Sequence, residues 1–385
     1  MTLPLEPQIR ELFAKEQAEA RPAVTAADIP ANYECITDEW LTGIVCRDVP
    51  GAQVVAHELD EPDEGTNNRR RIELEYNAAG QQAGLPASVF CKATSGLRNR
   101  LMLAHSGAIR CEVGFYKHVR PHVDFEVPFA FHADYDPRSF NSIIVLEDLR
   151  GKGRFLDLER DGSPELMREQ LSLLAKLHGR WAGAPDLAER FAALPTWEER
   201  FRGLMIVNLE RACREGLEHA HARALVPPRL WDNRDRIWPA TLASLETQAR
   251  LPRGLGHGDV HLHNWYRLED GTLGLGDWGV VHRGHWGRDL AYCLVAGLSV
   301  DERRASQDEL LAHYLAELKR QGGQDISLED AKAICRQAIM TALAFWTMTV
   351  APVPEMPDMQ PPKTALAFTA RLAAAVDDWE SLDAF

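Results

Sequence analysis

The chain has 385 residues, which is long enough for two or three domains and for a sizeable core without disulfide or metal staples. Hydrophobic residues make up 45% of it and charged residues 26%, a globular composition that excludes wholesale disorder and fibrous repeats. Its 43 Lys and Arg against 57 Asp and Glu leave a net charge of −14, which disfavours nonspecific binding to nucleic acid.

The cysteines and the apolar stretches indicate where the protein works. Seven cysteines are scattered without a C-x-x-C pair, as is typical of reduced, buried thiols. The N-terminus has no basic segment followed by an apolar stretch, so we expect no secretory signal. The longest charge-free run, residues 337–354, contains three Thr and two Pro and is expected to be a buried helix ending near Ala351. We therefore expect a cytoplasmic protein that does not act at a membrane.

The first part of the chain reads as two helices followed by strands. Helices are expected over residues 5–20 and 37–45, the second with Thr37 as its N-cap. Alternating apolar positions then predict five strands and one interrupting helix. The strands are expected at 52–59, 71–77, 87–94, 129–135 and 142–147, and the helix at 100–118.

Beyond residue 150 the pattern is mostly helical. Ser163 followed by Pro164 predicts the start of a helix that runs to Trp181. Ser327 opens another, whose apolar face extends to Trp346, and a last helix is expected over 364–380. The change from strands to helices places a boundary between residues 1–148 and 149–385.

Potential bases and ligands are concentrated in residues 254–292. Asp259 and Asn264 are five residues apart, which matches the H-x-D-x-x-x-x-N loop of phosphoryl-transfer enzymes. Two short strands joined by Asp270-Gly271 follow, and that pair predicts a hairpin. Because a hairpin returns the chain to its starting end, Asp277 should arrive beside Asn264.

This spacing predicts a magnesium site with a base beside it. Mg²⁺ prefers carboxylate and amide oxygens, which Asp277 and Asn264 supply. Asp259 is then left to orient an attacking hydroxyl and to accept its proton.

Two other kinds of function stay open on these residues. A zinc-dependent hydrolase would use the histidines, since His-rich clusters bind zinc. Those histidines are His261, His263, His282 and His285, and capped or surface histidines are the simpler interpretation of each. A nucleotide-binding regulator without turnover is the third alternative. The sequence argues against it, because Asp259, Asn264 and Asp277 are all residue types that can take part in phosphoryl transfer.

The same segment resembles the aminoglycoside phosphotransferase and choline kinase superfamily, small-molecule relatives of protein kinases, and is closest in look to its ecdysteroid-kinase-like branch. His257-Gly258-Asp259 followed by Asn264 resembles the family's catalytic loop. Gly276-Asp277-Trp278 stands where a magnesium-binding Asp-Phe-Gly would lie, and Arg288-Asp289-Leu290-Ala291 resembles the motif of a structural aspartate. The resemblance covers about residues 25–350.

The resemblance implies a two-lobed α+β fold of the protein-kinase kind, with a small β-rich N-lobe and a larger helical C-lobe. It implies ATP and Mg²⁺ as cofactors and transfer of the γ-phosphoryl group to a hydroxyl of a small molecule. It also implies that Lys92, on the third expected strand, contacts nucleotide phosphates and is held by Glu112 of the following helix. Asp289 and His257 are implied to brace the catalytic loop.

Three further expectations depend on the same resemblance. The backbone from Glu147 to Leu149 is implied to bind the adenine, as the hinge after the last N-lobe strand. Residues 60–71 stand in the place of the phosphate-covering loop, but they hold only one glycine. Residues 196–250 are the expected acceptor region, where Trp197, Trp231 and Trp238 predict an aromatic pocket for a bulky, hydrophobic alcohol rather than for aminoglycosides.

Overall fold

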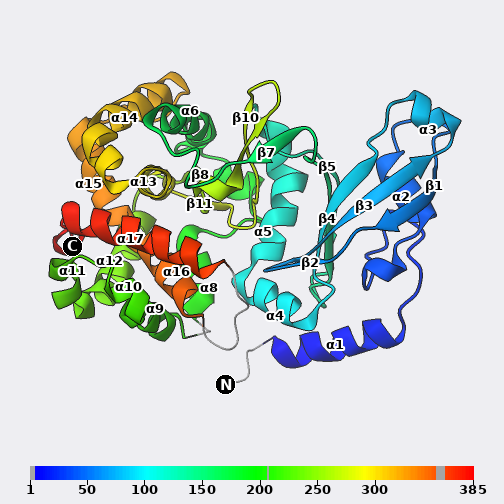
Figure 1. Ribbon diagram of the computed structural model, residues 1–385, viewed down its shortest axis with the longest axis horizontal. Coiled ribbons are helices and arrows are strands. Elements are labelled where there is room, and N and C mark those ends of the chain that lie inside the picture. Colours follow the sequence, from blue (N-terminus) through cyan, green and yellow to red (C-terminus); the bar gives the residue numbers. More distant parts are fainter. Residues whose placement is uncertain (1–4, 206–207, 353–359) are drawn as a thin grey trace. The chain divides into compact units, whose positions relative to one another are not determined.

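The computed structural model describes residues 5–205, 208–352 and 360–385. These form two compact units (Figure 1): the first comprises Met1–Pro121 with Val127–Gly153, and the second comprises His122–Glu126 with Arg154–Phe385. The first unit is built on an antiparallel sheet and the second is mainly helical. The predicted α+β class, with a β-rich N-terminal part and a helical C-terminal part, is confirmed.

The sheet of the first unit has six strands in the order β1-β3-β4-β6-β5, with the short β2 paired to β3. Every neighbouring pair is antiparallel. The five predicted strands are present, and β2 is an addition within the predicted loop. The bounds are β1 Val54–Leu59, β2 Asp63–Glu64, β3 Asn68–Tyr76, β4 Ser88–Ala93, β5 Ala130–Tyr135 and β6 Ser142–Glu147.

One face of this sheet is buried by helix α2 (Asp38–Val45). Trp40 and Leu41 of the helix pack in the same core as Ile72 and Val145 of the strands. Thr37 caps the helix as predicted, because its side chain accepts a hydrogen bond from the Trp40 N–H at 3.1 Å. The first unit also contains α1 (Glu6–Ala18) and the short α3 (Ala78–Gln82).

The helix predicted over residues 100–118 is interrupted. The structure has α4 (Leu97–Ser106) and α5 (Ala108–Gly114), followed by a π-helical turn, Phe115–Val119. Gly107 separates the two helices with a φ of +71°, the left-handed conformation in which glycine ends helices. The apolar spacing continues through the break, so periodicity alone predicts one helix where there are two.

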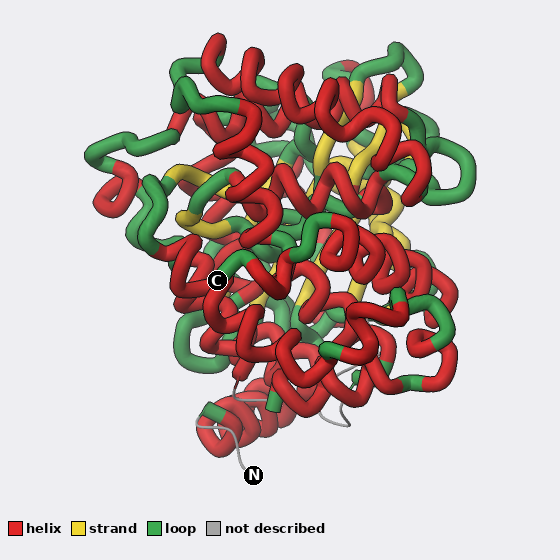
Figure 2. Tube along the Cα trace, turned by 90° about the vertical axis from the view of Figure 1, so that its left-hand side faces the viewer, coloured by secondary structure: helices red, strands yellow, loops and turns green. Residues whose placement is uncertain are grey.

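Helices make up most of the second unit. Figure 2 shows that helices outweigh strands in the chain as a whole. Ser163 caps the first of them as predicted, accepting a hydrogen bond from the Leu166 N–H at 3.2 Å. The helices are α6 Pro164–Trp181, α7 Leu187–Arg190, α8 Trp197–Leu204, α9 Leu209–Glu218, α10 Ala220–Arg223, α11 Pro228–Asp232, α12 Ile237–Ala249, α13 Gly287–Gly297, α14 Val300–Arg320, α15 Leu328–Ala338, α16 Met340–Val350 and α17 Pro362–Asp378.

The helix predicted from Ser327 to Trp346 is also divided, into α15 and α16, with Ile339 between them. Together they form the one stretch of the described chain, Leu328–Val350, that is long and apolar enough to cross a membrane. Its most apolar window is 61% buried inside the protein, and α16 ends at Val350 as the charge-free run predicts.

Short strands place the chemistry-bearing segment within the second unit. Strands β9 and β10 form the predicted hairpin, with β7 on the other side of β9, and β8 pairs with β11. The bounds are β7 Gly153–Phe155, β8 Gly254–Gly256, β9 Trp265–Leu268, β10 Leu273–Leu275 and β11 His282–Gly284.

Candidate active site

The loop between β8 and β9 is held by hydrogen bonds to Asp289 of α13. The Asp289 carboxylate accepts hydrogen bonds from the backbone N–H of His257 at 2.6 Å and of Gly258 at 2.9 Å. Gly258 has a φ of +87°, and a Cβ there would meet Val280, so this turn requires glycine. The bracing arrangement implied for Asp289 is therefore present.

Asp289 stays ionised although it is completely buried. Burial alone would raise its pKa, but the hydrogen bond and charge of His178 and the charges of His282 and Arg288 hold the pKa well below its usual range. His178 in turn makes a 2.8 Å hydrogen bond with the Tyr314 hydroxyl. These interactions therefore connect the loop to three helices, α13 through Asp289, α6 through His178 and α14 through Tyr314.

His257 joins the loop to the segment that carries Asp277. Its Nε2 hydrogen-bonds with the carbonyl of Gly276 at 2.9 Å, and its Nδ1 accepts from the Asp259 N–H at 3.1 Å. Burial lowers the pKa of His257, which keeps the ring neutral with its proton on Nε2. The ring also packs on Trp278, with centroids 4.4 Å apart.

The hairpin brings the backbone of Asn264 beside the segment that carries Asp277. The Asn264 side-chain NH₂ donates to the backbone carbonyl of Asp259 at 2.7 Å. The side-chain amide oxygen of Asn264 takes no part in this hydrogen bond. The backbone N–H of Gly276 donates to the Asn264 carbonyl at 2.8 Å, and Asp277 follows directly. Asp277 is exposed, and its φ of +57° is a strained conformation of the kind that collects at functional sites.

These two side chains fit a magnesium ion. Each offers a hard oxygen, one from an amide and one from a carboxylate, and Mg²⁺ is typically bound by one or two carboxylates with other oxygens completing the set. Asn264 is oriented by its hydrogen bond to Asp259, so its oxygen is positioned in advance.

The carboxylate of Asp259 is held by side chains that the sequence did not indicate. The Tyr292 hydroxyl donates to its Oδ1 at 3.1 Å and itself accepts from the Trp346 indole N–H at 2.5 Å. His261 Nε2 lies 3.5 Å from the other oxygen, Oδ2. The Asp259 side chain is 33% exposed, so it is fixed and still accessible. Tyr292 and Trp346 lie on apolar helices and read as core residues, so only their contacts identify them.

The ionisation states suit these contacts. Burial would raise the pKa of Asp259, but the charge and hydrogen bond of His261 and the charge of Arg288 together hold it well below its usual range. Burial and the neighbouring carboxylate raise the pKa of Tyr292 well above its usual value. Asp259 is therefore an acceptor and Tyr292 a donor throughout the physiological pH range.

The histidines do not assemble a metal centre. Throughout the described ranges, no three His, Cys, Asp or Glu side chains are grouped to hold a metal ion. Burial lowers the pKa of both His282 and His285 to about 4, and both lie in the protein interior. Nothing in this arrangement favours the zinc-dependent hydrolase.

In the first unit, Lys92 and Glu112 form the predicted ion pair. Lys92 Nζ lies 2.7 Å from Glu112 Oε1, and the two residues are only 9% and 4% exposed. Lys92 lies on β4 and Glu112 on α5. The break at Gly107 therefore does not prevent the contact.

The segment Glu147–Leu149 is engaged mostly with its own unit. The Glu147 N–H donates to the Phe129 carbonyl at 2.8 Å, and its carboxylate accepts from the Phe129 N–H at 2.7 Å. Asp148 is buried and accepts from Arg71 at 2.6 Å and from Ser88 at 2.7 Å, so it ties this segment to β3 and β4.

The loop expected to cover phosphates is held by Asn99 of α4. Its side-chain NH₂ donates to the carbonyls of Gly65 at 2.6 Å and Thr66 at 2.9 Å. The run Arg69 to Arg71 at its end is not simply solvated, because each arginine pairs with a carboxylate.

The three tryptophans expected to line an acceptor pocket lie in different surroundings. Trp197 is 3% exposed and lies in the core, with the Arg288 guanidinium 3.8 Å from its ring centroid, so the prediction is wrong for this residue. Trp231 is flanked by Arg223 and Arg234. Trp238 lines a cavity of about 170 Å³ between α9 and α12.

Comparison with models of known protein families finds one match. The model of the phosphotransferase enzyme family, APH, matches residues 85–331, a range that includes Lys92 and the whole segment from His257 to Asp289. No curated protein matches the chain.

Three solved structures of low identity are also similar to this chain. Macrolide 2'-phosphotransferase MphH from Brachybacterium faecium is 18% identical with a TM-score of 0.46, over 86% of this chain and 97% of that one. Choline kinase LicA from Streptococcus pneumoniae is 13% identical with a TM-score of 0.46, over 84% and 94%. Ethanolamine kinase from Plasmodium vivax is 12% identical with a TM-score of 0.45, over 83% and 81%.

Proposed function

Because the chain belongs to the phosphotransferase enzyme family APH, we propose that it transfers the γ-phosphoryl group of ATP, with Mg²⁺, to a hydroxyl of a small molecule. The observation that carries this proposal is the catalytic loop, in which Asp259 is fixed at both its backbone and its carboxylate and remains accessible. Phosphoryl transfer asks a protein mainly for positioning and charge stabilisation, and this loop is built for positioning.

Asp259 would orient the acceptor hydroxyl. The hydroxyl oxygen forms a bond to the γ-phosphorus, the bond from that phosphorus to the β,γ-bridging oxygen breaks, and ADP leaves with the electron pair. The hydroxyl proton passes to the Asp259 carboxylate and then to solvent. The lowered pKa of Asp259 makes it a weak base, so its main contribution is orientation rather than early proton removal.

Asn264 and Asp277 would hold Mg²⁺, which supplies neutralisation of phosphate charge when bound. Lys92, held by Glu112, would contact nucleotide phosphates, and the backbone at Glu147 and Leu149 would bind the adenine. We further propose that the protein acts in the cytoplasm, without a nucleic acid or membrane partner.

The proposal is tested by ADP release from Mg·ATP across a library of hydroxylated small molecules. We expect at least one acceptor to stimulate release, and Asp259→Asn to lower kcat on it by about 10²- to 10⁴-fold while nucleotide affinity is kept. Asp277→Ala should abolish productive binding of Mg·ATP. Asp270→Asn, an exposed aspartate in the turn of the same hairpin, is the matched control and should be active.

Normal turnover by Asp259→Asn would show that Asp259 is not the orienting base. Nucleotide binding without ADP release for any acceptor would favour the regulator without turnover.

Lys92 can be tested without an acceptor. Lys92→Ala removes a charged phosphate contact and should weaken Mg·ATP binding about tenfold or more in calorimetric titration. Lys117→Ala, which breaks an exposed ion pair with Asp134 in the same unit, should leave binding unchanged. Equal affinity for wild type and Lys92→Ala would contradict the role of Lys92.

A further inference from the structure

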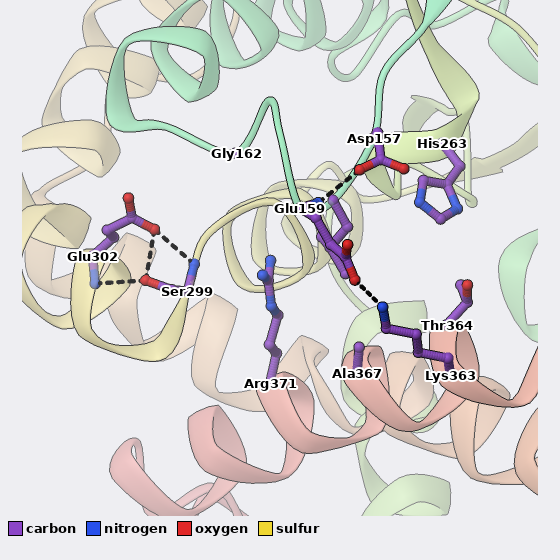
Figure 3. Close-up of a pocket in the computed structure, with 11 residues that line it drawn as sticks. Asp157, Glu159, Gly162, His263, Ser299, Glu302, Lys363, Thr364, Ala367 and Arg371 are labelled. Atoms are coloured by element: carbon purple, nitrogen blue, oxygen red, sulfur yellow. Dashed lines mark hydrogen bonds and ion pairs between the residues drawn. The ribbon is translucent and has the colours of Figure 1, made fainter.

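A cavity of about 890 Å³ lies in the second unit against α17. Its walls come from residues 157–162, from the start of α14 and from α17, and His263 of the catalytic loop closes one side (Figure 3). Volumes of this size are those of small-molecule sites. The smaller cavity beside Trp238 has no catalytic-loop residue in its wall.

The carboxylates around the large cavity are already engaged. Glu302 accepts hydrogen bonds from the backbone N–H of Ser299 at 3.0 Å and from its hydroxyl at 2.6 Å, as part of a capping box. Glu159 pairs with Lys363 at the rim. Asp157 accepts from the Glu159 N–H at 2.9 Å. These groups therefore contribute little free acceptor capacity to a ligand.

Arg371 is different, because its charge is not compensated. One guanidinium nitrogen, Nη1, donates to the Ala296 carbonyl at 2.8 Å, and no carboxylate of the described chain lies within ion-pair distance. Burial lowers the pKa of Arg371 and the charge of Glu302 offsets only part of this, yet an arginine remains protonated. Figure 3 shows the side chain rising from α17 into the space between Ser299 and Glu159. Its remaining donors suit a carboxylate or a phosphate.

The other side of the cavity offers hydrogen-bonding groups without a fixed charge. The imidazole of His263 lies in the wall, and its ring nitrogens can donate or accept a hydrogen bond. The hydroxyl of Thr364 stands near it on α17 (Figure 3). This pairing suits a ligand hydroxyl.

A series of ring contacts connects the wall of the cavity to the carboxylate of Asp259. The rings of His263 and His261 lie 5.9 Å apart, and both pack on Phe368 of α17. His261 in turn contacts Asp259. The same helix thus carries Arg371 and the ring that supports the catalytic loop.

We propose that this cavity binds a small hydroxylated organic anion, with its acidic group on Arg371 and its hydroxyl end towards His263.

Binding is tested first, without turnover, by NMR titration of the full-length protein. The probes are glycerol 3-phosphate and glycerate, with glycerol as the neutral control and choline as the cationic one. We expect at least one anion to bind saturably. Arg371→Gln should lower the affinity for that anion at least tenfold. Arg371→Lys keeps the charge but not the fork and should be intermediate.

Two controls locate the bound anion. Lys363→Gln changes a rim cation already paired with Glu159 and should alter affinity less than about threefold, the range of a surface ion pair. Lys92→Ala should not weaken binding of the anion. This result would distinguish the cavity from the phosphate contacts proposed for Lys92 in the first unit. Equal binding by wild type and Arg371→Gln, or saturation by neither anion, would overturn the proposal.

Discussion

Asp259 is fixed by side chains from three places in the chain. Asn264 holds its backbone carbonyl, Tyr292 of α13 holds one carboxylate oxygen, and His261 stands at the other. Trp346 of α16 adds a further hydrogen bond, from its indole N–H to the Tyr292 hydroxyl. Because the hydroxyl accepts from the indole, its own proton is directed to Asp259. Tyr292 therefore positions the carboxylate that we propose to be catalytic.

Tyr292→Phe should lower kcat about tenfold, the value of one hydrogen bond to a charged group, with KM for ATP unchanged. Initial rates on the best acceptor from the ADP-release screen measure it. In an Asp259→Asn background the same substitution should have little further effect, since Tyr292 acts through Asp259.

Tyr76→Phe is the matched control, because it removes a buried hydroxyl that donates to the Pro86 carbonyl at 2.8 Å in the first unit. It should cost stability of about 1 kcal/mol without changing kcat. Additive losses for Tyr292→Phe and Asp259→Asn would show that Tyr292 does not work through the carboxylate.

At the scale of elements, α9 and α16 approach very closely at Gly216. A Cβ at this position would overlap the backbone carbonyl of Thr347. By contrast, Gly43 within α2 has room for one, with Ala26 at 3.8–3.9 Å, an ordinary contact. Both glycines lie inside helices, where alanine is intrinsically preferred. Their opposite surroundings should therefore give substitutions of opposite sign.

Gly216→Ala should lower the free energy of unfolding by about 1–3 kcal/mol, because α9 and α16 must separate. Gly43→Ala should raise it by about 0.5–1 kcal/mol. Chemical denaturation of the two variants beside the wild type measures both. A stabilised Gly216→Ala would mean that the two helices do not pack in this way.

For the whole molecule, buried histidines set the response to acid. Burial lowers the pKa of His282 and of His285 to about 4, against about 6.5 in an unfolded chain. Below pH 6.5 the unfolded state binds protons that the folded state does not. Stability is therefore complete above pH 6.5 and falls as the pH drops towards 4.

Each of these histidines should remove about 2 kcal/mol of stability between pH 7 and pH 5. Denaturation at the two pH values measures the loss, and His285→Gln should reduce it by about 2 kcal/mol. His219→Gln, an exposed histidine, is the control and should leave the pH dependence as it is. The same loss in His285→Gln as in the wild type would contradict this origin.

Local features of this fold follow from the sequence. Thr37, Ser163 and Ser327 cap helices as predicted, since a cap depends on three or four consecutive residues. The pairing of Asn264 with the Asp277 segment follows from a short hairpin for the same reason. The predicted motifs and strands depend on backbone geometry within a few residues, which the local sequence dictates.

Only the tertiary structure decided the contacts between distant elements. Trp346 meets Tyr292 across 54 residues, and Arg371 projects into a cavity whose walls come from four segments. The breaks at Gly107 and Ile339 also escape the periodic pattern, because the apolar face continues on both sides. Burial decides these features, and burial depends on which helices meet: a buried aromatic side chain has the same periodicity whether it only fills the core or positions a catalytic carboxylate.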